Sequence, residues 1–252
     1  MTLSYPDAFA RFYDLIYDRL RNDVDNDFFL DRIKQAKGKV LEIGVGTGRF
    51  FLDALDSGAD IYGFDISPSM INILKEKLTE DQSDRISLQN IIDFNYDFEF
   101  DLIIAPFRVM MHLIEKGEQI QALNTVCRHL KPGGKFIFDS FVPDLKQLVT
   151  GLDNHTDFEG EYEPGKNLKR IVSTKPELID QIINVSFRLE WDENGDSKSE
   201  NWTLPLRFFF RYELEHLVER SDFDCYDIYG DYQGNKLSEK SKDFIVVCQK
   251  KL

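Results

Sequence analysis

The sequence predicts an α/β fold in which a mostly parallel sheet, with helices on both faces, carries an added antiparallel segment. Three observations support this prediction. Short apolar runs alternate with segments of helical periodicity between residues 39 and 142, a glycine-rich turn follows the first run, and the extended segments between residues 171 and 210 have no helical pattern between them. Strands that alternate with helices form parallel sheets through right-handed crossovers, whereas strands without intervening helices pair antiparallel.

The predicted core elements follow one another in order. Five short β-rich runs are expected to be strands: residues 40–43, 61–64, 86–88, 102–105 and 135–139. Three helices are expected between them: residues 47–57, a helix that begins after Ser67 and Pro68, and a helix with the apolar stripe Ile120, Leu123, Cys127 and Leu130. Serine is a favoured N-cap and proline fits the first helical position, so Ser67-Pro68 predicts a helix start.

The pattern changes after Phe141. Residues 171–174, 179–191 and 199–210 are predicted to be extended, with a turn at Glu193-Asn194-Gly195-Asp196. A helix is then expected from about Arg211, and closing strands at residues 224–229 and 244–249 bring the sheet to seven strands. The predicted domains are an N-terminal helical cap (1–38), a core (39–142 and 211–252) and an antiparallel β insertion after the fifth strand (143–210).

Composition and charge narrow the class of protein. The 252 residues are 42% hydrophobic and 30% charged, with a formal net charge of −14 at pH 7, which is typical of a globular domain. No apolar run approaches the roughly 20 residues that a bilayer span needs, and the N-terminus lacks the pattern of a secretory signal. We therefore expect a cytoplasmic protein that binds neither membranes nor nucleic acid, since its acidic balance repels polyanions.

The cysteines and histidines give no indication of a metal site. Cys127, Cys225 and Cys248 are far apart and odd in number, and none lies in a Cys-x-x-Cys arrangement. We interpret them as small hydrophobic residues of the interior. The four histidines show no ligand spacing with cysteine or carboxylate, so no metal is expected.

The strongest functional signal is the segment from Leu41 to Gly48, which reads LEIGVGTG between a predicted strand and a predicted helix. Glycines let a backbone turn tightly and approach a ligand closely, although such a turn can also be purely structural. Asp65 lies about 20 residues after the first glycine, at the end of the second strand, where a carboxylate accepts hydrogen bonds from ribose hydroxyls. A dehydrogenase fingerprint would need a glycine at Arg49, so the pattern favours a nucleoside without a pyrophosphate.

These motifs resemble those of class I S-adenosylmethionine-dependent methyltransferases. Residues 40–48 are similar to their motif I, and residues 65–70, which read DISPSM, to their acidic second-strand motif. Residues 101–104 and 130–135 resemble the fourth strand and the turn before the fifth. A closer likeness, to sugar N,N-dimethyltransferases, lies in residues 12–17 and in the insertion. The resemblance implies a seven-stranded Rossmann-like sheet and S-adenosylmethionine as cofactor.

The resemblance also implies a set of cofactor-binding residues. They are Gly44, Gly46 and Gly48 beside the methionyl part, Glu42 beside the amine, Asp65 at the ribose, Ile66 and Met70 at the adenine, Asn90, Ile91 and Ile92 at the adenine edge, and Tyr17 on a covering helix. The third-strand motif of the family ends in an acidic residue, and the matching residue here is Asn90. Its amide oxygen can still accept a hydrogen bond from the adenine amino group, but without charge.

The catalytic candidates are His112, Arg108 and Tyr13. Arg108 and His112 are four residues apart and would share a face if this segment were helical, with His112 as base and Arg108 as acceptor anchor. The alternative is a solvated arginine and a packed histidine. Tyr13, four residues before Tyr17, is predicted to lie near the methyl group, with core packing as the alternative.

Three functions follow from the sequence. The first is methyl transfer to a small-molecule N or O acceptor, the second is methyl transfer to protein or RNA, and the third is cofactor binding without catalysis. Structured surplus segments in α/β enzymes carry specificity, so the insertion is predicted to line the acceptor site. Its aromatic residues, Trp191, Trp202 and the run from Phe208 to Phe210, are interpreted first as core or dimer packing, and a homodimer through the insertion is one expected assembly.

Overall fold

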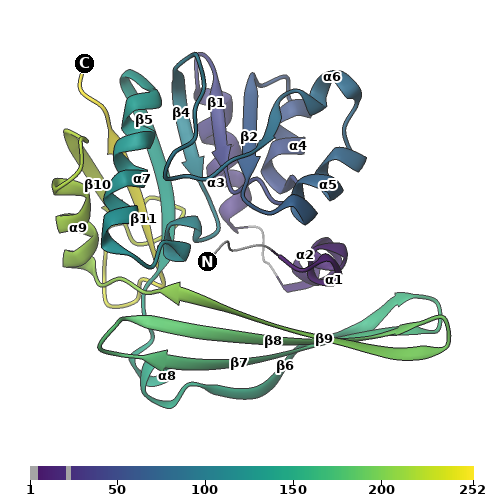
Figure 1. Ribbon diagram of the computed structural model, residues 1–252. Coiled ribbons are helices and arrows are strands. Elements are labelled where there is room, and N and C mark those ends of the chain that lie inside the picture. Colours follow the sequence, from purple (N-terminus) through teal and green to yellow (C-terminus); the bar gives the residue numbers. More distant parts are fainter. Residues whose placement is uncertain (1–4, 21–23) are drawn as a thin grey trace.

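The computed structural model describes residues 5–20 and 24–252 and contains two sheets (Figure 1). The larger one, the core sheet, has the order β10-β11-β5-β4-β1-β2-β3. Its strands are β1 (Val40–Ile43), β2 (Ile61–Asp65), β3 (Ile86–Leu88), β4 (Phe100–Ala105), β5 (Leu130–Phe141), β10 (Cys225–Tyr229) and β11 (Asp243–Gln249). All neighbours pair parallel except β11, which is antiparallel to both β5 and β10. The predicted seven-stranded, mostly parallel sheet is confirmed.

The helices include those predicted from periodicity and several short ones. They are α1 (Asp7–Arg11), α2 (Tyr13–Leu20), α3 (Val24–Gln35), α4 (Arg49–Asp56), α5 (Pro68–Glu76), α6 (Glu80–Ser83), the 3₁₀ turn η1 (Val109–His112), α7 (Lys116–His129), α8 (Leu145–Thr150) and α9 (Arg211–Glu219). None of these helices, within the part of the chain that the structure describes, is long and apolar enough to cross a bilayer.

Helices cover both faces of the core sheet because its central strands bury side chains on both sides. Successive residues of a strand point to opposite faces, so Val40 packs with α3, α4 and α5, whereas Leu41 and Ile43 pack with α7 and α9. Helix α5 begins at the predicted position, with Ser67 as N-cap and Pro68 following it. The Ser67 hydroxyl does not cap the helix, however, because it accepts a hydrogen bond from the backbone N–H of Tyr5 at 3.2 Å.

The insertion folds as a second, antiparallel sheet, the insertion sheet, as the sequence predicts. Its strands are β6 (Leu152–Glu163), β7 (Lys166–Glu177), β8 (Ile182–Glu193) and β9 (Asp196–Arg207), paired in chain order. The predicted turn joins β8 to β9, with Asn194 and Gly195 both at positive φ. Strand β6 is missing from the sequence prediction because its side chains are mostly exposed and its pairing with β7 shifts register three times.

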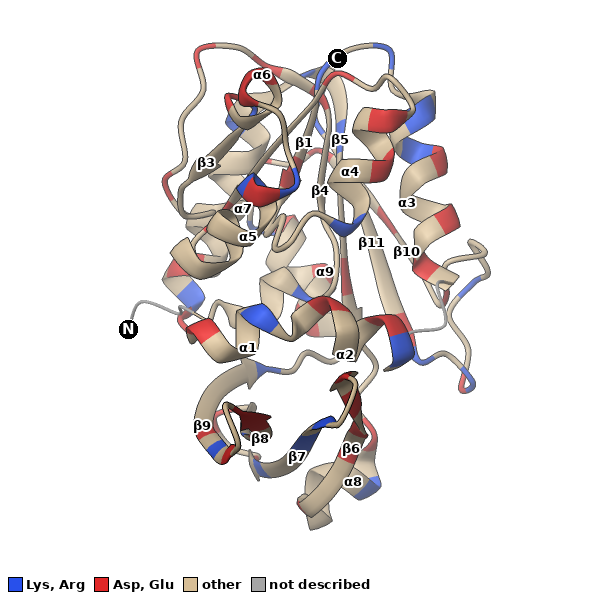
Figure 2. Ribbon diagram, turned by 90° about the vertical axis from the view of Figure 1, so that its right-hand side faces the viewer, with Lys and Arg blue, Asp and Glu red and all other residues tan. Residues whose placement is uncertain are grey.

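Helices α1 and α2 lie between the core sheet and the insertion sheet (Figure 2). Phe9, Phe12 and Ile16 form a third apolar cluster with buried side chains of β6, β7 and β8. Trp191 and Trp202 pack on this cluster, so these two residues serve contacts within the chain. Helix α3, by contrast, packs on the core sheet. The division at residue 38 remains a proposal, in which we now assign α3 to the core and only α1 and α2 to the cap.

The run from Phe208 to Phe210 serves mainly the core. Phe208 and Phe209 are buried in the cluster that α7 and α9 share with the core sheet, whereas Phe210 is exposed as the N-cap of α9. The homodimer through the insertion therefore stays a prediction. Fewer aromatic residues are available for such an interface than the sequence suggests, because most of them pack within the chain.

Candidate active site

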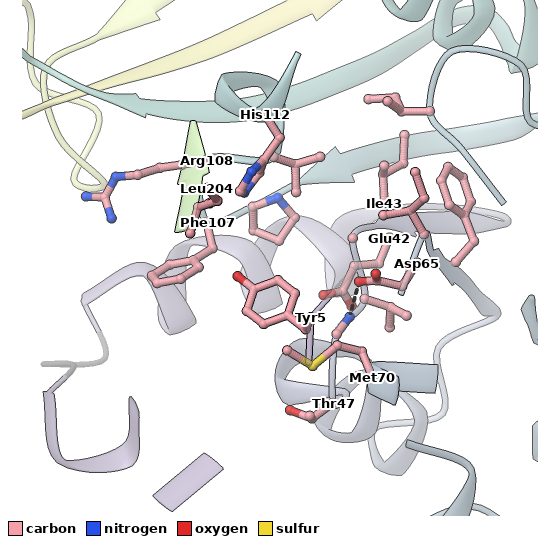
Figure 3. Close-up of a pocket in the computed structure, with 18 of the residues that line it drawn as sticks. Tyr5, Glu42, Ile43, Thr47, Asp65, Met70, Phe107, Arg108, His112 and Leu204 are labelled. Carbon is pink, nitrogen blue, oxygen red and sulfur yellow. Dashed lines mark hydrogen bonds between the residues drawn. The ribbon is translucent and has the colours of Figure 1, made fainter. Parts of the chain in front are cut away.

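One cavity of about 370 Å³ lies at the carboxyl ends of β1, β2 and β4. This edge is where ligands bind in open α/β sheets. The cavity is lined by three parts of the chain: the loops of the core sheet, Tyr5, Tyr13 and Tyr17 from the N-terminal segment, and side chains of β8 and β9. Glu42 and Asp65 lie at one end, and Phe107, Arg108 and Leu204 at the other, with Tyr5 between them (Figure 3).

The glycine turn after β1 lines the cavity, although not all of its glycines do. Gly44 and Gly46 are lining residues, and both have positive φ. A side chain on Gly44 would place its Cβ 2.5 Å from Val109 Cγ2, so only glycine lets the loop pass under η1. Gly48, predicted to line the cofactor, is absent from the lining and instead begins α4 with φ of 96°, where a Cβ would meet Leu74 at 2.4 Å.

Asp65 holds the glycine turn and the next helix in place. Its Oδ2 accepts a hydrogen bond from the Gly46 N–H at 2.9 Å, and its Oδ1 accepts one from the Ser67 N–H at 2.8 Å. Burial raises the pKa of this carboxyl, while the backbone donors oppose the rise. Each carboxylate oxygen has a further lone pair, so Asp65 can accept two more hydrogen bonds from a ligand in the cavity.

Glu42 is a buried carboxylate with an unsatisfied oxygen. Its side chain is 2% exposed, and Oε2 has no hydrogen-bond partner among the described residues. Burial raises the pKa of Glu42 well above its usual value, an effect that Arg49 opposes and Asp65 reinforces. A buried polar atom without a partner is costly, so this oxygen indicates a site for a ligand that donates hydrogen bonds.

Arg49 was not predicted as a site residue, yet it lines the same end of the cavity. Its Nε donates to Asn26 Oδ1 at 3.1 Å, and its Nη2 pairs with Asp25, whereas Nη1 is buried without a partner in the described chain. In the sequence, Arg49 was noted only because it stands where a dehydrogenase fingerprint would have its third glycine. Its place directly after the glycine turn, where helix α4 begins, was the available signal.

The residues predicted to bind the adenine, Ile66, Met70, Ile91 and Ile92, all line the cavity. Asn90 lines it as well, but its amide oxygen already accepts a hydrogen bond from the Ile92 N–H at 3.2 Å. If this oxygen also accepts a hydrogen bond from the adenine amino group, as expected, it must do so with its second lone pair.

The turn after β4 differs from the predicted helix. Phe107 and Arg108 have φ of 58° and 68°, in the left-handed region, and only then does η1 begin. The condition of a helix is therefore not met and Arg108 and His112 do not share a helical face, although both line the cavity. The Arg108 guanidinium instead lies over the rings of Phe107 and Phe141, at 5.6 and 5.5 Å, and its Nη2 approaches Asp243 at 3.5 Å.

His112 lines the cavity as a neutral imidazole. Burial lowers its pKa to about 4, and its Nδ1 has no hydrogen-bond partner among the described residues. Within the described part of the chain no carboxylate orients the ring, in contrast to the usual arrangement of a histidine base. His112 can therefore exchange a hydrogen bond with a bound molecule, whereas its low pKa makes it a weak base.

Three tyrosines cover the middle of the cavity. Tyr13 and Tyr17, both predicted, pack with their rings tilted by 44° and their centroids 4.4 Å apart, and Tyr17 meets Phe107 edge-on at 5.4 Å. Tyr5 was not predicted, and burial raises its pKa well above the usual value, so its phenol is neutral. Arg170 on β7 makes two hydrogen bonds to Asp157 on the neighbouring strand β6. Its guanidinium also lies 4.8 Å from the Tyr17 ring, and this contact joins the insertion sheet to the tyrosines.

Comparison with known proteins agrees with these features. Residues 40–134 match the family model described as a methyltransferase domain. A glycine/sarcosine N-methyltransferase of Parasynechococcus marenigrum is 26% identical over 234 residues, which cover 91% of this chain and 79% of the relative.

Two solved structures extend the likeness over both sheets. An S-adenosylmethionine-dependent methyltransferase from Clostridium acetobutylicum has a TM-score of 0.76 at 20% identity and covers 98% of this chain and 99% of its own. The sugar N-methyltransferase KedS8 from Streptoalloteichus has a TM-score of 0.75 at 17% identity and covers 100% of this chain and 98% of its own. At such identities the likeness is one of fold.

Proposed function

We propose that this chain is a class I S-adenosylmethionine-dependent methyltransferase and that it methylates a small-molecule N or O acceptor bound against the insertion sheet. The observation that carries this proposal is the continuity of the cavity, which runs from Glu42 and Asp65 to Val185, Phe187, Leu204 and Leu206 on β8 and β9. The likeness to a glycine/sarcosine N-methyltransferase and to a sugar N-methyltransferase supports it.

The residues at the glycine end fit the cofactor. An amino acid carries one ammonium and one carboxylate, and Glu42 Oε2 and Arg49 Nη1 are two buried atoms of matching charge without partners. We assign Glu42 to the ammonium, Arg49 to the carboxylate and Asp65 to the ribose hydroxyls. Met70 and Ile91, both buried, would pack on the adenine.

The protein's part in the chemistry is positioning and exclusion of water. When bound, the cofactor supplies a methyl group on a positively charged sulfur, ready for in-line displacement. Tyr5, Tyr13 and Tyr17 form an aromatic cover near this position, and aromatic faces attract cations. Holding two reactants in line can contribute roughly 7–11 kcal/mol, so the reaction needs no strong base if the acceptor is a neutral amine.

We expect S-adenosylhomocysteine to stabilise the protein and NADH to leave it unchanged. A ligand at about 100 times its Kd stabilises a fold by roughly 2.7 kcal/mol, which corresponds to about 5–10 °C in Tm for a chain of this size. A thermal melt with each ligand measures this. A shift with NADH and none with S-adenosylhomocysteine would contradict the assignment of the glycine turn.

We expect cofactor affinity to rise with pH, and Glu42→Gln to remove part of this dependence. In the empty site burial raises the pKa of Glu42, and pairing with an ammonium lowers it, so binding releases a proton wherever the free carboxyl is protonated. The loss of the charged partner should also lower affinity by about tenfold. Calorimetry in buffers of different ionisation enthalpy counts the released protons.

The control for that experiment is Glu118→Gln, which changes a half-buried acid on the cavity lining. It should keep both the affinity and the proton release of the parent protein. Equal proton release from the parent and Glu42→Gln would remove Glu42 from the ammonium site.

A screen of acceptors separates the three functions considered above. Formation of S-adenosylhomocysteine with a pool of small metabolites, but not with protein extract or RNA, is the expected result. Turnover only with a macromolecule would favour the second function, and tight cofactor binding without turnover on any acceptor would favour the third. In a complex with S-adenosylhomocysteine, a side chain of the insertion should lie within about 10 Å of the sulfur, roughly the reach of a small acceptor.

A further inference from the structure

The acceptor end of the cavity is formed by one face of the insertion sheet. Alternate residues of a strand share a face, and this inner face carries Ile183, Val185 and Phe187 on β8 and Trp202, Leu204 and Leu206 on β9. The register places Val185 opposite Leu204, and Ile183 opposite Leu206. Leu204 is 4% exposed, and Ile183 and Leu206 also pack on the main core.

The outer face of the same strands is polar. Ser186 and Thr203, which are opposite each other, exchange a hydrogen bond of 2.9 Å between their hydroxyls on the exposed side. Four inner-face residues, Val185, Phe187, Leu204 and Leu206, line the cavity, and all four are apolar. Phe141 and Leu113 extend this apolar surface from the core sheet.

Few charges remain at this end of the cavity for an acceptor. Among the described lining residues, the basic ones are Arg49 and Arg108. Arg49 lies at the cofactor end, which leaves Arg108, whose Nη2 approaches Asp243 at 3.5 Å and whose Nε is buried without a partner among the described residues, as a single cation for an acceptor. A diphosphate carries two or more negative charges and needs cationic partners when it leaves water. The cavity therefore suits a molecule without phosphate groups.

The neutral polar groups at this end suit an amine. His112 Nδ1 has no partner among the described residues, and the phenol of Tyr5 is neutral. Desolvation disfavours any cation here, as it does for His112, so an alkylammonium that enters this surface should lose its proton readily. An alcohol would instead need a base to raise its nucleophilicity, and His112, whose pKa is lowered to about 4, is a weak one.

Resting on the proposed function, the geometry points to a compact amine with an apolar aliphatic or aromatic body as the acceptor, and not a nucleotide-linked sugar. The apolar body lies on Val185, Leu204 and Leu206, and the nitrogen faces the methyl group. The nitrogen lone pair forms the new N–C bond while the C–S bond breaks, and the sulfur keeps that electron pair as a neutral thioether. The methylated ammonium then releases its proton to water.

The direct test compares five acceptors at equal cofactor concentration: 2-phenylethylamine, hexylamine, 2-phenylethanol, glycine and a thymidine-diphosphate-linked amino sugar. We expect kcat/KM for the two apolar amines to exceed that for the other three by at least about tenfold, because glycine lacks the apolar body, the alcohol needs a base, and the nucleotide sugar carries phosphates that need cationic partners. A preference for the nucleotide sugar, glycine or the alcohol would overturn the inference and leave the proposed function standing. Cofactor binding without turnover on any small molecule would instead overturn the proposed function.

Two variants test the surface itself. Leu204→Ala should raise KM for 2-phenylethylamine by about tenfold, and Val185→Thr, which keeps the side-chain shape, should raise it in the same direction. Kd for S-adenosylhomocysteine should not change in either variant. Thr203→Ala, which alters the neighbouring residue on the outer face, is the matched control and should leave KM unchanged. Equal KM values in a folded Val185→Thr, Thr203→Ala and the parent protein would remove the inner face from the acceptor site.

Discussion

Replacing Asp65 by alanine should weaken binding of S-adenosylmethionine by at least tenfold. If both hydrogen bonds to the ribose are lost, the factor should be on the order of 100 or above. A hydrogen bond to a charged group contributes about 1.5–3 kcal/mol, and a carboxylate that accepts from both ribose hydroxyls makes two. Asp65 also accepts from the N–H groups of Gly46 and Ser67. The variant therefore loses the ribose contact and releases the turn that surrounds the cofactor.

Calorimetry with S-adenosylhomocysteine measures this loss, and circular dichroism checks that the variant is folded. Asp93→Ala is a suitable control because Asp93 is an exposed carboxylate directly after the residues predicted to bind the adenine. It should bind as the parent does, which excludes a general effect of removing one negative charge. An unchanged affinity in folded Asp65→Ala would place the ribose elsewhere.

The cofactor end could be predicted because its chemistry depends on short segments. The glycine turn and Asp65 follow directly from strand ends, and the parallel sheet then brings those ends together. Every predicted cofactor residue except Gly48 lines the cavity. Gly48 fails because its left-handed backbone serves the start of α4. Arg49 and Tyr5 were not predicted because the features that mark them depend on distant parts of the chain. For Arg49 the feature is a buried Nη1 without a partner among the described residues, and for Tyr5 it is a place on the cavity lining together with residues of β8 and β9.

The acceptor end was harder to predict for the same reason. The spacing of Arg108 and His112 fits a helix, yet Phe107 and Arg108 both adopt positive φ. Such conformations cost about 1–3 kcal/mol each and persist only where the surroundings hold them. Here the surrounding group is Asp139 on β5, whose Oδ1 accepts a hydrogen bond from the Arg108 N–H at 3.2 Å. Nothing in the local sequence around Phe107 indicates a carboxylate some 30 residues later.

Asp139 is therefore expected to position the acceptor end without contacting the acceptor. It is 1% exposed, and its Oδ2 accepts a hydrogen bond from the Tyr232 hydroxyl at 3.1 Å. Asp139→Ala should free the turn that carries Phe107, Arg108 and η1. Because a displacement of about 1 Å can cost roughly 100-fold in rate, kcat/KM for the acceptor should fall by a factor of this order, while cofactor Kd changes little.

The matched variant Asp139→Asn should restore most of the activity, because its amide oxygen can accept from Arg108 and its amide nitrogen can donate to the Tyr232 oxygen. The two variants should share one further property. Burial raises the pKa of Asp139 from 3.8 to about 6, so the native state binds this proton more tightly than the unfolded state does. Stability should then decrease as pH rises from about 4 to 6, by roughly 3 kcal/mol for this group.

Neither variant has an ionisable group at position 139, so both should lose that decrease, which urea unfolding at pH 4.5 and 7 measures. Activity restored by asparagine together with a flattened pH dependence would mean that Asp139 acts through the shape of its hydrogen bonds and not through its charge. If asparagine were as inactive as alanine, the charge itself would be required, and the Coulombic contact with Arg108, which opposes the raised pKa of Asp139, would be the interaction to examine. If both variants kept full activity, the left-handed turn would be held by other contacts, and Asp139 would have no positioning role.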